Sequence, residues 1–178
     1  MIAGYKYTEK EQKTLLKSMV LIADSREQAN KHITDYLTQK EIPFVTQKLD
    51  FGDYSYMLPA CPDLGIYRDL YFSNSIVIER KNSLDELAGN FGDGRTQFEN
   101  EFMRADKCDM TLMVEQPGGY GDILAHKYNS QMNERAFFGS LITFECRYNI
   151  KTAFVDKAMA GQYIFAKFYY HLRGVLKK

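Results

Sequence analysis

The sequence predicts an α/β fold in which a mixed central β-sheet is flanked by helices. Short apolar runs alternate along the chain with longer stretches whose apolar residues recur at helical spacing. The run Thr111–Glu115 is continuously apolar up to its final acid, which is typical of a buried central strand. With 178 residues and no internal repeats or low-complexity tracts, the chain has the size of one domain.

The first half of the chain predicts two helices and three strands. Residues 8–17 are rich in lysine and contain neither proline nor glycine, so they predict a short helix or a frayed arm. Pro43 opens a strand, and Gly52-Asp53 marks a turn or bulge before the next strand. The elements expected here are helices at 8–17 and 28–39 and strands at 20–23, 44–49 and 54–57.

The second half predicts three strands and four helices. Asn90–Gly94 separates two helices because glycine and asparagine break helical patterns. Pro117–Gly121 has the most flexible composition in the chain, and we expect a loop there. The elements expected here are strands at 76–81, 111–115 and 152–155 and helices at 84–91, 95–107, 134–148 and 158–176.

Charge and composition limit the function classes. Basic and acidic residues number 23 each, which counts mildly against non-specific nucleic-acid binding. Basic residues nevertheless dominate from Lys151 onward, whereas acidic residues dominate between 85 and 101. The apolar runs are too short for a membrane span and no signal-peptide core is present, so we expect a cytoplasmic protein without a membrane partner. No phosphate-binding glycine loop ending in lysine occurs, which excludes an NTP-driven motor.

Cysteines and histidines give no metal signal. The three cysteines are odd in number and widely spaced, which predicts reduced thiols instead of disulfides or a zinc site. The three histidines also lack metal-ligand spacing, and we expect no site role for them. These histidines are His32, His126 and His171.

Asp53 and the run Glu79-Arg80-Lys81 carry the strongest functional signal. Two carboxylates can hold a hard divalent cation through their oxygens. Such a cation polarises a phosphate and lowers the pKa of a bound water. Side chains alternate along a strand, so Lys81 points to the same side as Glu79, where it can orient that water or neutralise developing charge. The pattern predicts metal-dependent phosphodiester hydrolysis, with Mg²⁺ or Mn²⁺ as the cofactor.

An extended form of this pattern is much more specific. After Glu79-Arg80-Lys81, three residues precede Asp85, and Asp93-Gly94-Arg95 follows. Upstream, Asp24-Ser25-Arg26-Glu27 comes directly after the first apolar strand. Together these motifs resemble the nuclease domain of the XPF family, which includes the archaeal Hef nuclease. The resemblance covers nearly the whole chain, from Met19 to the C-terminus.

The resemblance implies a fold, an activity and a domain division. The fold would be restriction-endonuclease-like, with the nuclease domain at 19–178 after an N-terminal helical extension at 1–18. The activity would be that of a metal-dependent endonuclease on flap, fork or branched DNA, in repair or recombination. Two alternatives stay open: a non-cleaving DNA-binding or scaffold module with the same fold, and a junction resolvase of the same superfamily.

The resemblance also implies the metal and catalytic residues. Asp53, Glu79 and Asp24 would bind the metal, together with the main-chain carbonyl of Arg80. Lys81 would orient the attacking water. Asp24 could instead cap the helix that follows, since an aspartate after a strand is a natural N-cap.

The remaining motif residues have two possible roles each. Arg26 would contact DNA phosphate and Glu27 the metal-bound water, or the two would pair with each other. Arg95 begins a helix after glycine, a place suited to phosphate, although an ion pair within its helix is the alternative. The Arg80 side chain points away from Glu79, so we expect it to support the site by fixing Asp85 or Glu27.

Two features depart from the family pattern. Residues 57–75 form an insertion between the strands that carry Asp53 and Glu79, where relatives have a tight hairpin. We also expect no helix-hairpin-helix module, so DNA specificity would come from the insertion, from a homodimer or from another DNA-processing protein.

We expect the homodimer to form through the C-terminal helices. That helix is apolar or aromatic around much of its circumference, whereas covering a core requires only one apolar stripe. The residues that would form the interface are Tyr163, Ala166, Phe168, Tyr170 and Val175, with the pair Phe137-Phe138 extending it.

Overall fold

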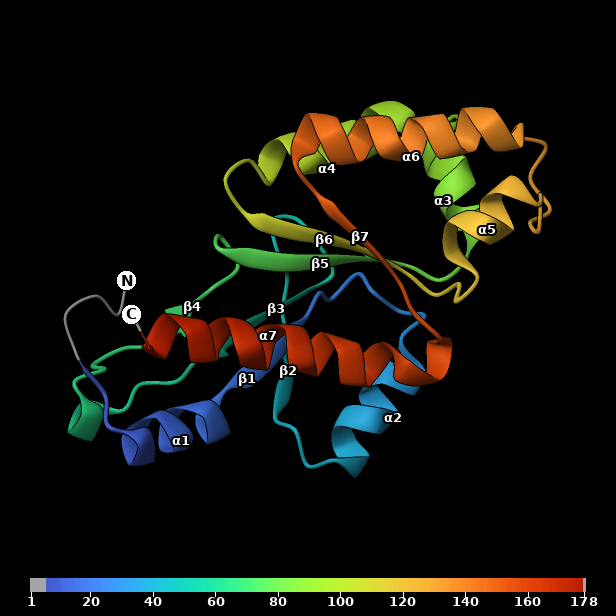
Figure 1. The fold of residues 1–178 in the computed structure, drawn as a ribbon. Coiled ribbons are helices and arrows are strands. Elements are labelled where there is room, and N and C mark those ends of the chain that lie inside the picture. The colour runs from blue at the N-terminus through green and yellow to red at the C-terminus, as the bar shows by residue number, and fades with distance from the viewer. Residues whose placement is uncertain (1–5, 178) are drawn as a thin grey trace.

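The computed structural model describes residues 6–177 (Figure 1). The strands are β1 (Val20–Ala23), β2 (Phe44–Thr46), β3 (Tyr54–Leu58), β4 (Leu70–Tyr71), β5 (Ile76–Lys81), β6 (Asp109–Val114) and β7 (Lys151–Phe154). The α-helices are α1 (Glu9–Ser18), α2 (Lys31–Gln39), α3 (Leu84–Phe91), α4 (Arg95–Arg104), α5 (Gly119–Leu124), α6 (Glu134–Tyr148) and α7 (Ala160–Leu176). Short 3₁₀ helices lie at Pro62–Leu64 and Lys157–Met159.

The strands of the described residues form one seven-stranded mixed sheet. Its order is β2-β1-β3-β5-β6-β7, and β4 pairs with β3 outside this row. β1 and β2 are parallel, as are β5, β6 and β7. β3 runs antiparallel to both neighbours and joins the two parallel blocks. The predicted mixed α/β sheet is therefore confirmed.

Helices cover both faces of the sheet (Figure 1). α1, α2 and α7 lie on one face, and α3, α4, α5 and α6 lie on the other. Each layer buries its own apolar cluster: the first cluster includes Leu15, Ile33 and Phe168, and the second includes Leu87, Phe98 and Phe144. Within residues 6–177, no helix has the length and apolar character needed to cross a bilayer.

Strand β5 divides its side chains between the two layers. Ile76 and Ile78 belong to the first cluster and Val77 to the second. Since side chains alternate along a strand, Arg80 continues the first side, whereas Glu79 and Lys81 continue the second. The Arg80 side chain thereby lies on one face of the sheet, and the side chains of Glu79 and Lys81 lie on the other.

Helix α1 is packed and is not a frayed arm. Thr8 and Glu11 form a reciprocal capping box at its start, in which each side chain accepts from the other's backbone N–H. Leu15 and Leu16 lie in the first buried cluster, beside residues of α7. The division of the chain at residue 18 stays a prediction.

Three predicted elements are shorter by about three residues in the structure, and the first is α2, which begins at Lys31 and not at residue 28. β2 ends at Thr46, and the strand expected to reach residue 49 is interrupted because the Leu49 N–H donates to the Asp24 carboxylate at 2.6 Å. α4 ends at Arg104, and Lys107 adopts a left-handed conformation with φ of 69° just before β6.

The loop expected at Pro117–Gly121 is wrong, because Gly119 begins helix α5. Gly119 has φ of +56°, a conformation that glycine adopts without strain. The Tyr120 ring packs edge-on against Phe154 at 4.9 Å, and Ile123 is fully buried. Tertiary burial therefore stabilises a helix that the local composition opposes.

Residues 57–75, the predicted insertion, extend the sheet by adding a short strand beside β3. β3 extends to Leu58, and β4 returns to pair with it antiparallel. The Phe72 ring stacks on Tyr56 at 4.5 Å, which fixes the end of the excursion to the core. The insertion therefore leaves the start of β3 beside β5.

Candidate active site

The C-terminal ends of β1 and β5 meet at one edge of the sheet, where β3 begins. The Asp53 N–H donates to the Ile78 carbonyl at 2.8 Å, and the Asp24 N–H donates to the Asp53 carbonyl at 2.7 Å. Residues far apart in the sequence are thereby held together at this edge. Ligands of open α/β sheets bind outside such strand ends.

Gly52 allows this close approach. Its φ is +70°, and a Cβ atom at this position would lie 2.9 Å from the Cβ of Val77. Only glycine combines this left-handed conformation with such a near neighbour. Gly52 therefore brings the chain against β5 and places Asp53 beside Glu79.

A cavity of about 310 Å³ opens at this point. Its walls come from the loop after β1, the start of β3, the end of β5 and helices α3 and α4. The lining residues are Arg26, Glu27, Gly52, Asp53, Glu79, Lys81, Asn90, Gly94, Gln97, Phe98 and Glu101.

Asp53 is held by a backbone donor in an unfavourable electrostatic position. Its Oδ2 accepts from the Arg80 N–H at 2.7 Å. Burial, and next the negative charge of Glu79, raise the pKa of Asp53 well above its usual range. A cation placed between these two carboxylates would relieve their repulsion.

Glu79 and Lys81 form a buried pair on the same wall. The Lys81 ammonium donates to Glu79 Oε1 at 2.7 Å and lies 5.0 Å from the centre of the Phe98 ring. Burial opposes the charged lysine, but attraction to Glu79 outweighs it and raises the pKa of Lys81. Lys81 is therefore a fixed positive charge inside the cavity.

The donor set fits a cation of the magnesium type. Among residues 6–177, no group of three or more His, Cys, Asp or Glu side chains is close enough to enclose a metal. Mg²⁺ usually keeps several waters and binds one or two carboxylates together with substrate phosphate. Asp53 and Glu79 supply those two carboxylates.

Asp53→Asn should stabilise the metal-free protein. A raised carboxyl pKa means that the folded state holds its proton above about pH 4, where an unfolded aspartate loses it. Stability from this group is therefore full below that pH and is lost as the pH rises through the folded pKa. Asparagine keeps the acceptor for the Arg80 N–H and has no such loss.

Thermal melts of both proteins from pH 4 to pH 8 in chelator check this expectation. The melting temperature of Asp53→Asn minus that of the parent should increase with rising pH. The increase should be about 2–4 °C for each kcal/mol of unfavourable electrostatic free energy that the substitution removes. A gap that is constant across the range would mean that Asp53 is not strained.

Asp24 lies outside the cavity lining, and the metal role predicted for it stays a prediction. Its Oδ1 accepts from the Arg26 N–H at 2.7 Å and from Arg26 Nε at 2.8 Å. Its Oδ2 accepts from Arg26 Nη2 at 3.0 Å and from the Leu49 N–H at 2.6 Å. Burial favours the neutral acid, yet these hydrogen bonds lower the pKa of Asp24. The carboxylate is occupied in fixing the loop after β1.

Arg26 and Glu27 both line the cavity but do not pair with each other in the way the sequence allowed. Arg26 is anchored to Asp24 and to the Leu49 carbonyl, while its side chain stays 59% exposed. Glu27 Oε1 accepts from the Ala29 N–H at 3.1 Å and lies 3.3 Å from Arg80 Nη1. Arg26 is thus a preoriented cation at the cavity mouth.

Comparisons with known proteins identify the family of the chain. A family model described as the ERCC4 domain matches residues 23–168, which is most of the chain. The chain belongs to the ERCC4 domain family. The match includes every motif residue named above, and it confirms the family resemblance seen in the sequence. No curated protein sequence matches the chain.

Solved structures place the ERCC4 domain in the same fold as XPF. XPF from Aeropyrum pernix superposes with a TM-score of 0.61 at 20% identity, over 86% of this chain and 65% of that one. XPF from Aeropyrum pernix in complex with DNA gives 0.61 at 18% identity, over 87% and 66%. The chain thus spans about two thirds of those XPF chains.

Two acids of the ERCC4 domain site went unpredicted. Glu101 on α4 lines the cavity, and burial, followed by repulsion from Glu79, raises its pKa. Phe98 and Phe102 mark the buried side of α4, and this apolar pattern gave no sign that the acid between them lines the cavity. Glu115, expected only as the end of a strand, accepts from Arg80 Nε at 2.7 Å and Arg80 Nη2 at 2.9 Å.

Asp85 and Arg95 lie apart from this cavity. Asp85 accepts from the backbone N–H groups of Asn129 and Ser130 at 2.7 and 2.8 Å, whereas Arg80 contacts Glu27, the other partner predicted for it. Arg95 lies 3.4 Å from Glu99 on its own helix and 5.4 Å from the Phe144 ring centre. The ion pair within the helix is thus the observed contact of Arg95.

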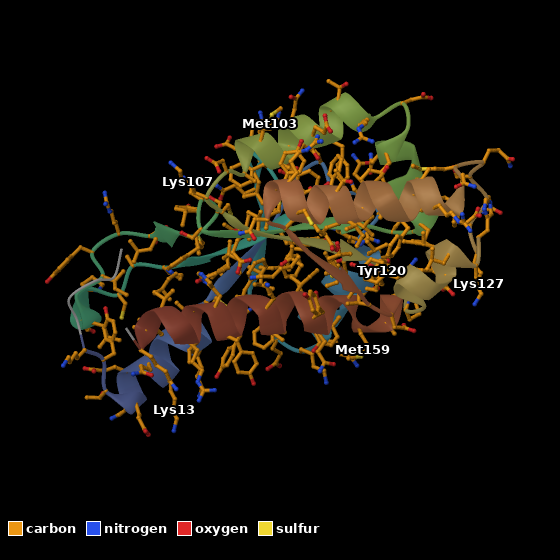
Figure 2. The ribbon with its side chains drawn as sticks, turned by 45° about the horizontal axis from the view of Figure 1, so that its top comes forward. Lys13, Met103, Lys107, Tyr120, Lys127 and Met159 are labelled. Carbon is orange, nitrogen blue, oxygen red and sulfur yellow. The ribbon has the colours of Figure 1, made fainter. Side chains whose placement is uncertain are left out.

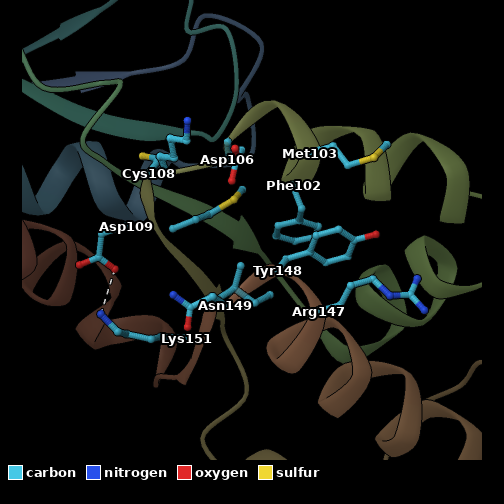
Figure 3. Close-up of a pocket in the computed structure, with 13 residues that line it drawn as sticks. Phe102, Met103, Asp106, Cys108, Asp109, Arg147, Tyr148, Asn149 and Lys151 are labelled. Atoms are coloured by element: carbon cyan, nitrogen blue, oxygen red, sulfur yellow. Dashed lines mark hydrogen bonds and ion pairs between the residues drawn. The ribbon is translucent and has the colours of Figure 1, made fainter.

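A larger hollow of about 680 Å³ lies at the start of β6, at the opposite edge of the sheet from the cavity around Asp53 and Glu79 (Figure 3). Its acid Asp109 is paired with Lys151 at 3.0 Å, and its aromatic rings Phe102 and Tyr148 stack on each other at 5.6 Å. It contains none of the motif residues of the ERCC4 domain.

Positively charged side chains project from several parts of the chain. Lys13, Lys107 and Lys127 project from three separate parts of the ribbon (Figure 2). This distribution fits the balanced charge of the chain, and it leaves the cavity residues as the main guide to function.

Proposed function

We propose that this ERCC4 domain is a metal-dependent DNA endonuclease selective for flap, fork or branched DNA. The observation that carries the proposal is the convergence of Asp53, Glu79 and Lys81 in one cavity. A mere scaffold has no need for repelling carboxylates beside a buried lysine, because such groups cost stability. One of the similar XPF structures is a complex with DNA, which supports DNA as the substrate. A DNA substrate also implies a location inside the cell.

Each cavity residue has a place in the proposed mechanism. Asp53 and Glu79 would hold Mg²⁺ or Mn²⁺, which polarises the scissile phosphate and lowers the pKa of a bound water. The Arg80 N–H fixes the Asp53 carboxylate. Lys81 holds a positive charge where negative charge grows on the phosphate. Arg26, exposed at the mouth, can contact a neighbouring phosphate as a charge-assisted donor. We leave Asp24 out of the metal ligands because Arg26 and Leu49 occupy its oxygens.

The test is incubation with supercoiled plasmid and with synthetic flap, fork and four-way substrates, with and without Mn²⁺. Preferred cutting of flaps or forks supports the proposal, and preferred cutting of four-way junctions supports the resolvase alternative. Binding of these substrates without any cleavage would establish the scaffold alternative instead.

Lys81→Met separates charge stabilisation from metal binding. Methionine keeps the length of the side chain and frees Glu79, so Mn²⁺ affinity should stay within about threefold or rise. The cleavage rate should fall by about 10²–10³, the usual cost of losing one transition-state donor. Calorimetric Mn²⁺ titration and single-turnover cleavage measure the two effects. A large loss of Mn²⁺ affinity with an unchanged rate would contradict the assigned role.

We also propose a homodimer through the outer side of α7, on a smaller surface than the sequence predicted. Phe168 and Phe137 are fully buried in the chain's own clusters, so their expected interface role is wrong. Tyr163, Ala166 and Tyr170 follow helical spacing, and Tyr170 is 63% exposed. Aromatic residues are enriched at interfaces.

Sedimentation equilibrium at micromolar concentration tests the dimer. The parent should sediment at twice 20.7 kDa, and Tyr170→Glu should weaken association. A parent mass equal to one chain would exclude the homodimer, and the nuclease proposal would be unaffected.

A further inference from the structure

Glu115 forms hydrogen bonds with the end of β5 through both its backbone and its side chain. Its N–H donates to the Lys81 carbonyl at 2.9 Å. Its carboxylate accepts from Arg80 Nε at 2.7 Å and Arg80 Nη2 at 2.9 Å, a bidentate arrangement of high directional preference. One residue after β6 therefore fixes both residues that end β5.

A second layer holds Glu115 in turn. His32 of α2 lies with Nε2 2.7 Å from Glu115 Oε1, and the ionised carboxylate makes the imidazole N–H the donor. Glu27 Oε1 lies 3.3 Å from Arg80 Nη1. Arg80 and Glu115 are both buried on the face of the sheet opposite the cavity. His32, Arg80 and Glu115 do not line the cavity around Glu79 and Lys81. Glu27 does line it.

Arg80 links the two faces of the sheet. Its side chain is fixed by Glu115 on one face, and its backbone N–H holds Asp53 Oδ2 at 2.7 Å on the cavity side. Glu79 and Lys81 are its neighbours in the strand. A shift of Arg80 would move all three cavity residues relative to one another.

We infer that Glu115 and His32 are positioning residues, which clamp Arg80 so that Asp53, Glu79 and Lys81 keep the geometry needed for the metal and the phosphate. The inference rests on the proposed nuclease function. Strand ends otherwise open locally, and here the clamp also opposes repulsion between Asp53 and Glu79. Partners behind a metal site typically change metal affinity or activity by about 10–100-fold when removed.

The test combines three readouts on His32→Ala, His32→Gln and Glu115→Gln. Hydrogen exchange of the Arg80 and Lys81 amides in metal-free protein reports the clamp itself. Mn²⁺ titration and single-turnover cleavage report its effect on the site. We expect faster exchange and about 10–100-fold weaker Mn²⁺ binding or slower cleavage for His32→Ala and Glu115→Gln. His32→Gln should recover most of the loss, because its amide can donate to Glu115 from nearly the same place.

Two controls separate positioning from general destabilisation. His126→Ala removes a comparable pair, since His126 lies 3.5 Å from Glu134 away from the cavity. Leu16→Ala removes a buried side chain of α1 and lowers stability. Both controls should keep parental Mn²⁺ affinity and cleavage.

Two outcomes would overturn the inference. In the first, His32→Ala and Glu115→Gln behave like the parent in exchange, metal affinity and rate. In the second, His32→Ala and Glu115→Gln lose no more activity than Leu16→Ala does when the variants are compared at the same loss of melting temperature. A parent that neither binds Mn²⁺ nor cuts DNA would instead reject the proposed function, and the exchange readout would still decide whether the clamp exists.

Discussion

Asp53→Asn and Glu79→Gln are each expected to abolish metal-dependent cleavage of DNA while the chain stays folded. Each change keeps the shape of the side chain and removes one of the two carboxylates that we assign to the cation. A cation bound through only two carboxylates cannot lose one of them and keep its place. We expect cleavage to fall by at least about 10³-fold, comparable to removing a principal source of transition-state stabilisation.

Single-turnover cleavage with Mn²⁺ measures this effect, with circular dichroism to establish folding. Asp109→Asn is the matched control, since Asp109 is an acid paired with Lys151 in the hollow at the other end of β6. It should cut at the parental rate. Equal loss in the control, or parental rates in both cavity variants, would place the chemistry elsewhere.

Arg80→Ala is expected to destabilise the fold by about 3–5 kcal/mol, because it leaves buried carboxylates without their cation. Glu115 would lose both hydrogen bonds from the guanidinium, and Glu27 would lose its ion pair. Alternation along the strand predicted that the Arg80 side chain points away from Glu79, and in the structure it lies on the opposite face from Lys81. The catalytic role predicted for Arg80 through its main-chain carbonyl stays a prediction.

Urea unfolding measures this loss, and Arg147→Ala is the control. Arg147 pairs with Glu99 at 3.3 Å near the surface, so its removal should cost less than about 1 kcal/mol. Replacing Arg80 and Glu115 together by methionine and leucine should restore much of the stability, since neither member of the buried pair is then left without its partner and Glu27 keeps the Ala29 N–H. If Arg80→Ala were as stable as Arg147→Ala but inactive, Arg80 would act on the substrate directly.

Alternation along β5 made much of the site predictable. Ile76, Val77 and Ile78 specify a buried strand, and period two then separates Arg80 from Glu79 and Lys81. Asp53 was predictable through its motif. Only the structure explains why glycine precedes it: the backbone at Gly52 packs so closely against Val77 that a side chain would not fit.

Other parts of the site depend on contacts that no local pattern encodes. The occupied carboxylate of Asp24 follows from the path of residue 49, which ends β2 early. His32 meets Glu115 across 83 positions of sequence, so neither residue alone indicates the pair. Helix α5 formed against its glycine-rich composition because Ile123 is buried.

The central claim is that Asp53 and Glu79 jointly hold the divalent cation in the cavity of this chain. Paramagnetic broadening of backbone amide signals by substoichiometric Mn²⁺ tests it without requiring cleavage. We predict selective loss of the signals of Gly52, Asp53 and residues 79–81 in the parent, and no such loss in Asp53→Asn or Glu79→Gln. Broadening centred on Asp109 and its neighbours, or unchanged broadening in the two variants, would contradict the account.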